Sequence, residues 1–162
     1  FVKLEHVFDV LTSLAPRFES PYVFGAFALA QEGRDFPAAE RLMQKGIAAN
    51  PRSGRLAFEM GFLYYVRPGG RDLAHAAEWF ERASHLPGAP ANADRFAAFT
   101  RQHGGDLIVA LQLWKHIHAT TSNRYLRDIA EREAERIQVA LAAGRRERAI
   151  TRLSTPIVRT KP

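Results

Sequence analysis

The chain contains no cysteine among its 162 residues. A protein without cysteine forms no disulfide bonds, binds no zinc through thiolates and has no thiol nucleophile. The sequence also lacks an apolar run of the roughly 18–20 residues that a membrane-spanning helix requires. The chain begins at Phe1, which predicts that an upstream part, such as a signal or an anchor, has been removed. These features leave the compartment open between the cytoplasm and the periplasm.

Catalytic and nucleotide-binding motifs are lacking as well. The sequence has no Gly-x-Ser-x-Gly, no Walker-type loop and no Gly-x-Gly-x-x-Gly. The pairs Gly69-Gly70 and Gly104-Gly105 follow helical segments, which is typical of turns that end helices. His116 and His118 would lie about 200° apart around a helix, so they are poorly placed to share a metal. We therefore expect no catalytic residue, no metal site and no cofactor, and we predict that the chain is not an enzyme.

Net charge is nearly absent from the first 123 residues, although the whole chain carries a formal charge of +6. Residues 124–162 hold ten Lys and Arg against five acidic residues. This uneven distribution argues against nucleic-acid binding by the chain as a whole. The basic end lacks interleaved aromatic residues that would stack on bases. A solvated tail is therefore favoured over an RNA, anionic lipid or acidic protein contact at this end.

Three prolines, Pro16, Pro51 and Pro87, are spaced 35 and 36 residues apart. Each lies between two segments with helical periodicity, where proline ends one helix and permits another to begin nearby. Each unit is divided again by a turn in which glycine supplies left-handed backbone and aspartate caps the next helix. The pattern predicts helices over residues 2–14, 19–32, 36–49, 53–66, 72–85, 91–103, 106–119 and 123–143, and a short helix over 145–153.

Small residues recur at matching positions of these helices, where they would let two helices approach closely. Larger residues, Phe80 and Trp114, would fill the space between neighbouring hairpins. One amphipathic hairpin cannot bury its apolar face alone, so the copies are expected to stack. The small residues are Ala26, Gly61 and Ala98 in the first helices, and Ala39, Ala76 and Ala110 in the second helices.

The clearest copy of this pattern runs from Ala57 to Pro87. It contains Met60, Gly61, Tyr64, Gly70, Ala76, Phe80, Ala83 and Pro87. The pattern resembles the tetratricopeptide repeat over residues 1 to about 143. The copies depart from the family at Ala57, Asp94 and Arg101, where signature aromatic residues are replaced. Residues 76–88 also resemble bacterial repeat proteins.

The resemblance implies an all-α fold, a right-handed α-solenoid of antiparallel helix hairpins. It implies a repeat domain over residues 1–143, closed by the helix 123–143, and a basic, partly extended C-terminal segment over residues 144–162. Residues 2–16 would be the second helix of a repeat whose first helix is missing. In the family, the first helix of each hairpin lines a concave groove.

That groove predicts a partner-binding site at the inward positions of the first helices. The positions are Val23, Phe27, Arg55, Phe58, Phe62, Tyr65, Arg95, Phe99, Gln102 and His103. Aromatic residues there would anchor a peptide, and arginine would orient a carboxylate. The alternative is that the rings are buried against one another. Chaperone-binding members use Lys and Asn at inward positions, so Phe58 and Phe62 disfavour that specialised function.

We therefore predict a scaffold that binds a protein or peptide partner through an aromatic-lined groove. The alternative is a structural subunit of a larger, membrane-linked complex that uses the convex face or the basic tail. RNA binding is the less favoured third function.

Overall fold

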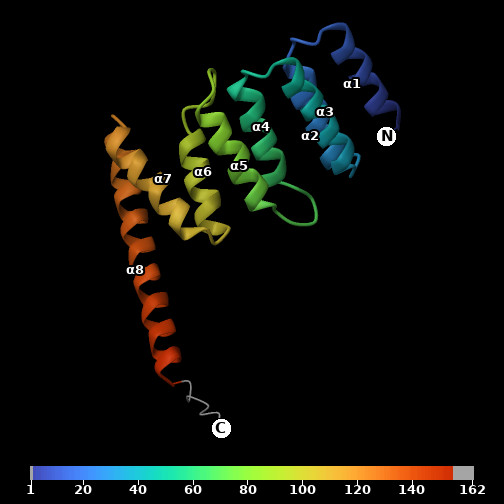
Figure 1. Ribbon diagram of the computed structural model, residues 1–162. Helices are drawn as coiled ribbons and strands as arrows, with labels where there is room; N and C mark the ends of the chain where they lie inside the picture. Colours follow the sequence, from blue (N-terminus) through green and yellow to red (C-terminus); the bar gives the residue numbers. More distant parts are fainter. Residues whose placement is uncertain (1, 155–162) are drawn as a thin grey trace, which may run out of the picture. The chain divides into compact units, whose positions relative to one another are not determined.

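The computed structural model describes residues 2–154, and every regular element in that range is an α-helix (Figure 1). The helices are α1 (Val2–Leu14), α2 (Ser20–Gln31), α3 (Phe36–Ala49), α4 (Gly54–Tyr65), α5 (Leu73–Ser84), α6 (Ala93–His103), α7 (Leu107–Thr120) and α8 (Arg124–Ser154). The chain forms two compact units, Phe1–Asp106 and Leu107–Pro162, here called the first and second unit. None of the described helices combines the length and apolar character needed to cross a bilayer.

The predicted helix positions are confirmed to within two residues for α1 to α7, but the last helix is longer than predicted. Helix α8 runs without a break to Ser154, across the expected boundary at residues 143 and 144. Gly144 is the only helix-weakening residue at this junction, and one interior glycine costs about 1 kcal/mol without ending a helix. The predicted short helix 145–153 is therefore part of α8. The extended end was predicted for residues 154–162. Ser154 is instead the last residue of α8, and residues 155–162 lie outside the described residues.

Side-chain caps start four of the described helices, and in α8 the cap is Asn123, whose Oδ1 accepts a hydrogen bond from Leu126 N–H at 3.2 Å. Asp35, Ser53 and Asp72 each accept a hydrogen bond from a backbone N–H three residues later, at 3.0, 3.1 and 3.1 Å. Capping one of the free N–H groups in this way stabilises the first turn of a helix. The prediction that a glycine adopts the left-handed conformation is wrong for the turn between α2 and α3. There Arg34 takes the positive φ of 52°, whereas Gly69 and Gly105 do so in the other turns.

Helices α1 to α6 of the first unit pack each against the next, and α2 also contacts α4. The predicted small residues are at these crossings, because Ala26, Ala39, Ala76 and Ala98 are all inaccessible to solvent. A Cβ atom on Gly61 would lie 2.8 Å from Phe80 Cδ1 and 3.1 Å from the Ala76 carbonyl oxygen. Gly61 and Ala76 are therefore a contact point between α4 and α5, as predicted, whereas the meeting of Ala98 with Ala110 stays a prediction.

The second unit consists of α7 packed against α8. Helix α7 buries Ala110, Trp114 and Ile117, and α8 buries Ala130, Ala134 and Ile137. Both sets have the three- and four-residue spacing of a single helix face. The small alanines permit close approach, and Trp114 is the largest of these buried side chains.

Tyr64 joins α4 to α3 through a hydrogen bond that its hydroxyl donates to Glu40 Oε1 at 2.6 Å. Burial and this bond raise the pKa of Tyr64 well above its ordinary value. The neutral phenol is therefore stabilised in the folded state, and this stability is complete below the unfolded-state pKa of about 10.

Stability should consequently fall more steeply above about pH 10 in the wild type than in Tyr64→Phe, because only the wild type must ionise this group on unfolding. Urea unfolding at pH 8 and at pH 10.5 measures the difference. A Tyr125→Phe variant is the control, since Tyr125 is 69% exposed. Equal pH dependence in the wild type and Tyr64→Phe would contradict the expectation.

Candidate binding surface

A continuous row of aromatic rings crosses three helices of the first unit. Phe27 on α2 lies 6.0 Å from Phe62 on α4, between ring centroids, and Phe62 lies 6.0 Å from Tyr65. Tyr65 in turn lies 6.2 Å from Phe96 and 6.4 Å from Phe99, both on α6. These distances fall in the range in which aromatic pairs attract one another. We call these five residues the aromatic surface.

All five rings of the aromatic surface are half-buried. Their partial burial distinguishes them from the core rings, because Tyr22 and Phe80 have no solvent exposure. It also distinguishes them from exposed surface rings such as Phe24, which is 70% exposed. Half-buried rings on adjacent helices form a preorganised apolar face that still contacts solvent.

Phe58 differs from its predicted place in the groove. It is only 8% exposed and lies 5.0 Å from Phe80 and 5.4 Å from Phe96, between ring centroids. Phe58 therefore belongs to the core between the helices and not to the groove. Phe58 and Phe62 are four residues apart and share one side of α4, but only Phe62 reaches the surface. The alternative that the rings bury one another is thus correct for Phe58.

Phe96 belongs to the aromatic surface but was absent from the predicted set. It contacts Phe58 and Phe80 in the core, and Phe62 and Tyr65 on the surface. Its ring therefore links the two groups. Its position three residues before Phe99 was the available signal, because residues three apart share a helix face.

The other predicted residues lie around this surface. Val23 is half-buried one turn before Phe27 on α2, and Gln102 is half-buried on α6. His103 is exposed and stacks on Phe99 with the ring centroids 3.9 Å apart. Its Nδ1 lies 2.9 Å from the Phe99 carbonyl oxygen. His103 therefore extends the row of rings along α6.

A pocket of about 290 Å³ opens on the aromatic surface, between Tyr65, Arg95, Phe96 and Phe99. Three of its four lining residues contribute rings, and the fourth contributes a guanidinium group. Arg95 is exposed, and no residue in the described part of the chain forms an ion pair with it. The pocket thus combines apolar walls with a cation free to bind an anion.

Two arginines near α4 are already engaged. Arg55 lies 3.9 Å from Glu19, between Nη1 and Oε2. Partial burial raises the pKa of Glu59 above its ordinary value, and the charge of Arg55 opposes that shift. Arg71 lies over the Tyr65 ring, with its Cζ 4.9 Å from the centroid. Arg95 is therefore the cation on this surface with neither an acidic nor an aromatic partner among the described residues.

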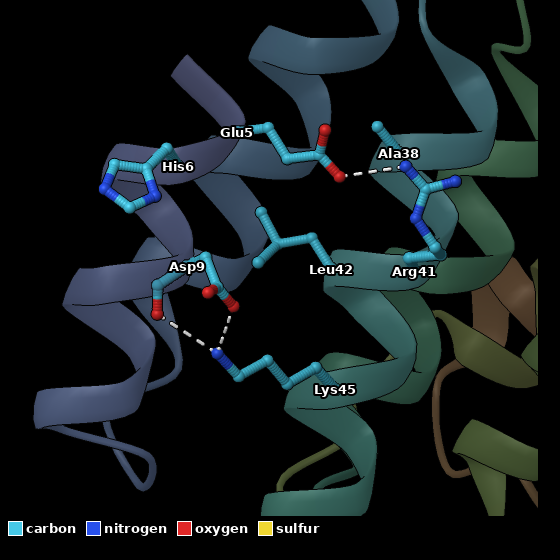
Figure 2. Close-up of a pocket in the computed structure, with 7 residues that line it drawn as sticks. All are labelled: Glu5, His6, Asp9, Ala38, Arg41, Leu42 and Lys45. Carbon is cyan, nitrogen blue, oxygen red and sulfur yellow. Dashed lines mark hydrogen bonds and ion pairs between the residues drawn. The ribbon is translucent and has the colours of Figure 1, made fainter. Parts of the chain in front are cut away.

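A second opening lies between α1 and α3 and has a volume of about 430 Å³ (Figure 2). Glu5 accepts a hydrogen bond from Arg41 at 2.9 Å, and Asp9 accepts one from Lys45 at 2.6 Å. The bond from Lys45 lowers the pKa of Asp9. Figure 2 shows both pairs bridging the opening. Because these four charges are paired with one another, they are not available to bind a ligand. The two ion pairs mainly hold α1 against α3.

Among the described residues, no group of three or more His, Asp and Glu side chains is placed to hold a metal ion. The aromatic surface also brings no nucleophile and base together, since its polar groups are arginines, Gln102, Glu59 and His103. Its chemistry is that of apolar contact with local charge pairing. Comparisons with protein-family models, with curated proteins and with solved structures found no match for this chain.

Proposed function

We propose that the chain is a scaffold that binds a protein or peptide partner through the aromatic surface. The observation that carries this proposal is the unbroken row of half-buried rings from Phe27 to Phe99. Aromatic side chains supply large contact area at low entropic cost and dominate the binding energy of many interfaces. The arginines at its edges add polar contacts that orient a partner.

The rings gain more by binding than an isolated exposed ring would. Their mutual contacts and their packing on α2, α4 and α6 fix their positions before a partner arrives. A partner that covers them therefore removes apolar area from water without the cost of ordering these side chains. Contiguous apolar patches of this kind mark interaction sites on soluble proteins.

We further propose that the first unit is part of a right-handed α-solenoid of the tetratricopeptide type. The proline spacing of 35 and 36 residues supports this, as does the burial of Gly61 against Ala76 and Phe80. In such an array, α2, α4 and α6 are the first helices of successive hairpins. The aromatic surface would then lie on the concave side, which the family uses for peptide binding.

A variant combining Phe62→Ala, Tyr65→Ala and Phe99→Ala tests the proposal. These rings are half-buried, so the fold should persist. Partner affinity should fall by at least about 30-fold, because the loss of even one central aromatic anchor costs about 2 kcal/mol. Partners are first identified by cross-linking and mass spectrometry with the wild type. Each purified partner is then titrated against both proteins by calorimetry.

The control is Phe24→Ala combined with Tyr125→Ala, which removes exposed rings outside the aromatic surface. This variant should bind as the wild type does. Circular dichroism establishes that both variants are folded. Unchanged affinity in the triple variant would contradict the proposal. If deletion of residues 145–162 abolished binding instead, the assembly function through the basic tail would be favoured.

A further inference from the structure

The pocket beside Arg95 is at the lower limit of size for a free ligand. Its volume of about 290 Å³ lies just below the roughly 300–1,000 Å³ of most small-molecule sites. It is also open to solvent on the outer side, because Arg95 is exposed. One apolar side chain of a larger partner fits such a site better than an enclosed metabolite does. Tyr65, Phe96 and Phe99 would contact that side chain.

Arg95 adds a charge requirement to this contact. Its guanidinium has no ion-pair partner among the described residues, and it stands at the edge of the pocket. Guanidinium groups bind carboxylates through two parallel hydrogen bonds. A carboxylate adjacent to the inserted side chain would therefore complete the site. The other nearby cations are engaged, since Arg55 pairs with Glu19 and Arg71 covers Tyr65.

We propose that the partner segment carries an apolar side chain that enters this pocket and an Asp or Glu side chain that pairs with Arg95. This inference rests on the proposed function, because it specifies what the aromatic surface recognises. The carboxylate belongs to an internal residue and not to a chain end. The rings continue from the pocket toward Phe27 and toward His103, so a segment that ended at the pocket would leave half of the surface uncovered.

A nucleic acid fits this surface less well than an acidic peptide. Glu59 lies on α4, three residues before Phe62 of the aromatic surface, where its carboxylate would repel a string of phosphates. Only one unpaired guanidinium is offered by the pocket. Binding of a polyanion generally requires several cations and depends steeply on salt.

The test uses short fluorescent peptides and the full chain. The acidic probe is a capped peptide, Gly-Ser-Glu-Phe-Glu-Leu-Ser-Gly, and the neutral probe replaces both Glu by Gln. Fluorescence anisotropy at low salt should give about fivefold tighter binding of the acidic probe, as expected for a partly exposed ion pair. Arg95→Gln should abolish this preference, and Arg95→Lys should retain part of it. Arg52→Gln, which removes an exposed arginine from the loop before α4, should leave it unchanged.

Several results would overturn the inference. These are equal binding of both probes by the wild type, a preference that persists in Arg95→Gln, or no binding of either probe at millimolar protein. A neutral probe with a free terminal carboxylate that binds as tightly as the acidic probe would overturn the internal position. Tighter binding of a ten-nucleotide oligouridine would identify a polyanion site instead.

The two proposals fail in different ways. If both probes bind equally but neither binds the triple ring variant, the aromatic surface remains the binding site and only the acidic specificity is wrong. If the acidic probe binds the triple ring variant as tightly as it binds the wild type, the aromatic surface itself is excluded. The Arg95 variants and the ring variants therefore report on separate claims.

Discussion

Replacing Phe80 with alanine should destabilise the first unit by about 3–5 kcal/mol, the usual cost of removing a fully buried phenylalanine. Phe80 has no solvent exposure. Its ring centroid lies 5.0 Å from that of Phe58 on α4 and 5.1 Å from that of Phe96 on α6. The ring therefore joins three consecutive helices. Its removal would leave a cavity that none of these helices can fill without moving.

Urea unfolding followed by circular dichroism measures this loss. The control is Phe24→Ala, because the same side chain is removed from a position that is 70% exposed. The control should lose less than about 1 kcal/mol, as surface substitutions usually do. A loss of this small size in Phe80→Ala would show that the ring is not the packing centre of α4, α5 and α6.

The Phe80 substitution should also weaken the aromatic surface. Phe96 contacts Phe80 on one side and Tyr65 on the other. Loss of the buried ring would therefore free Phe96 to move, and the pocket that Phe96 lines would lose part of its preorganised shape. Binding through rings that must first be ordered costs additional side-chain entropy. Stability and partner affinity are thus coupled through Phe96.

The helices and their contact points could be predicted from the sequence because the signals are local. Proline, glycine and capping residues such as Ser53 act within one turn of their position. Small residues at matching positions indicate where helices cross, and Gly61 and Ala76 indeed meet there. The continuation of α8 past residue 143 could not be predicted in this way. A single Gly144 is too weak a signal, and helical neighbours on both sides outweigh it.

The division between core and surface rings could not be predicted from the sequence. Phe58 and Phe62 have the same residue type and share one side of α4, so helical periodicity treats them alike. Their difference arises because Phe80 of α5 and Phe96 of α6 pack directly on Phe58. Such contacts depend on how the three helices cross. The free guanidinium of Arg95 likewise depends on the absence of a nearby described carboxylate, which residue spacing does not reveal.

The second large effect is expected for Gly61→Val, which should destabilise the first unit by about 3 kcal/mol, near the upper end for overpacked cores. Valine itself is better tolerated than glycine within a helix, so local propensity alone predicts a gain. The loss arises because a Cβ at residue 61 would lie 2.8 Å from Phe80 Cδ1 and 3.1 Å from the Ala76 carbonyl oxygen. Either the Phe80 ring or the α4–α5 spacing would have to shift.

A double-mutant cycle separates this clash from other effects of the Gly61 substitution. Phe80→Ala removes the ring that the new methyl groups would meet, so Gly61→Val should cost at least about 1 kcal/mol less in that background than in the wild type. Urea unfolding of the four proteins gives the coupling energy. Additive losses, within about 0.5 kcal/mol, would contradict contact between these positions. Favourable coupling would instead show that glycine at position 61 is required because the buried ring occupies the space where a side chain would lie.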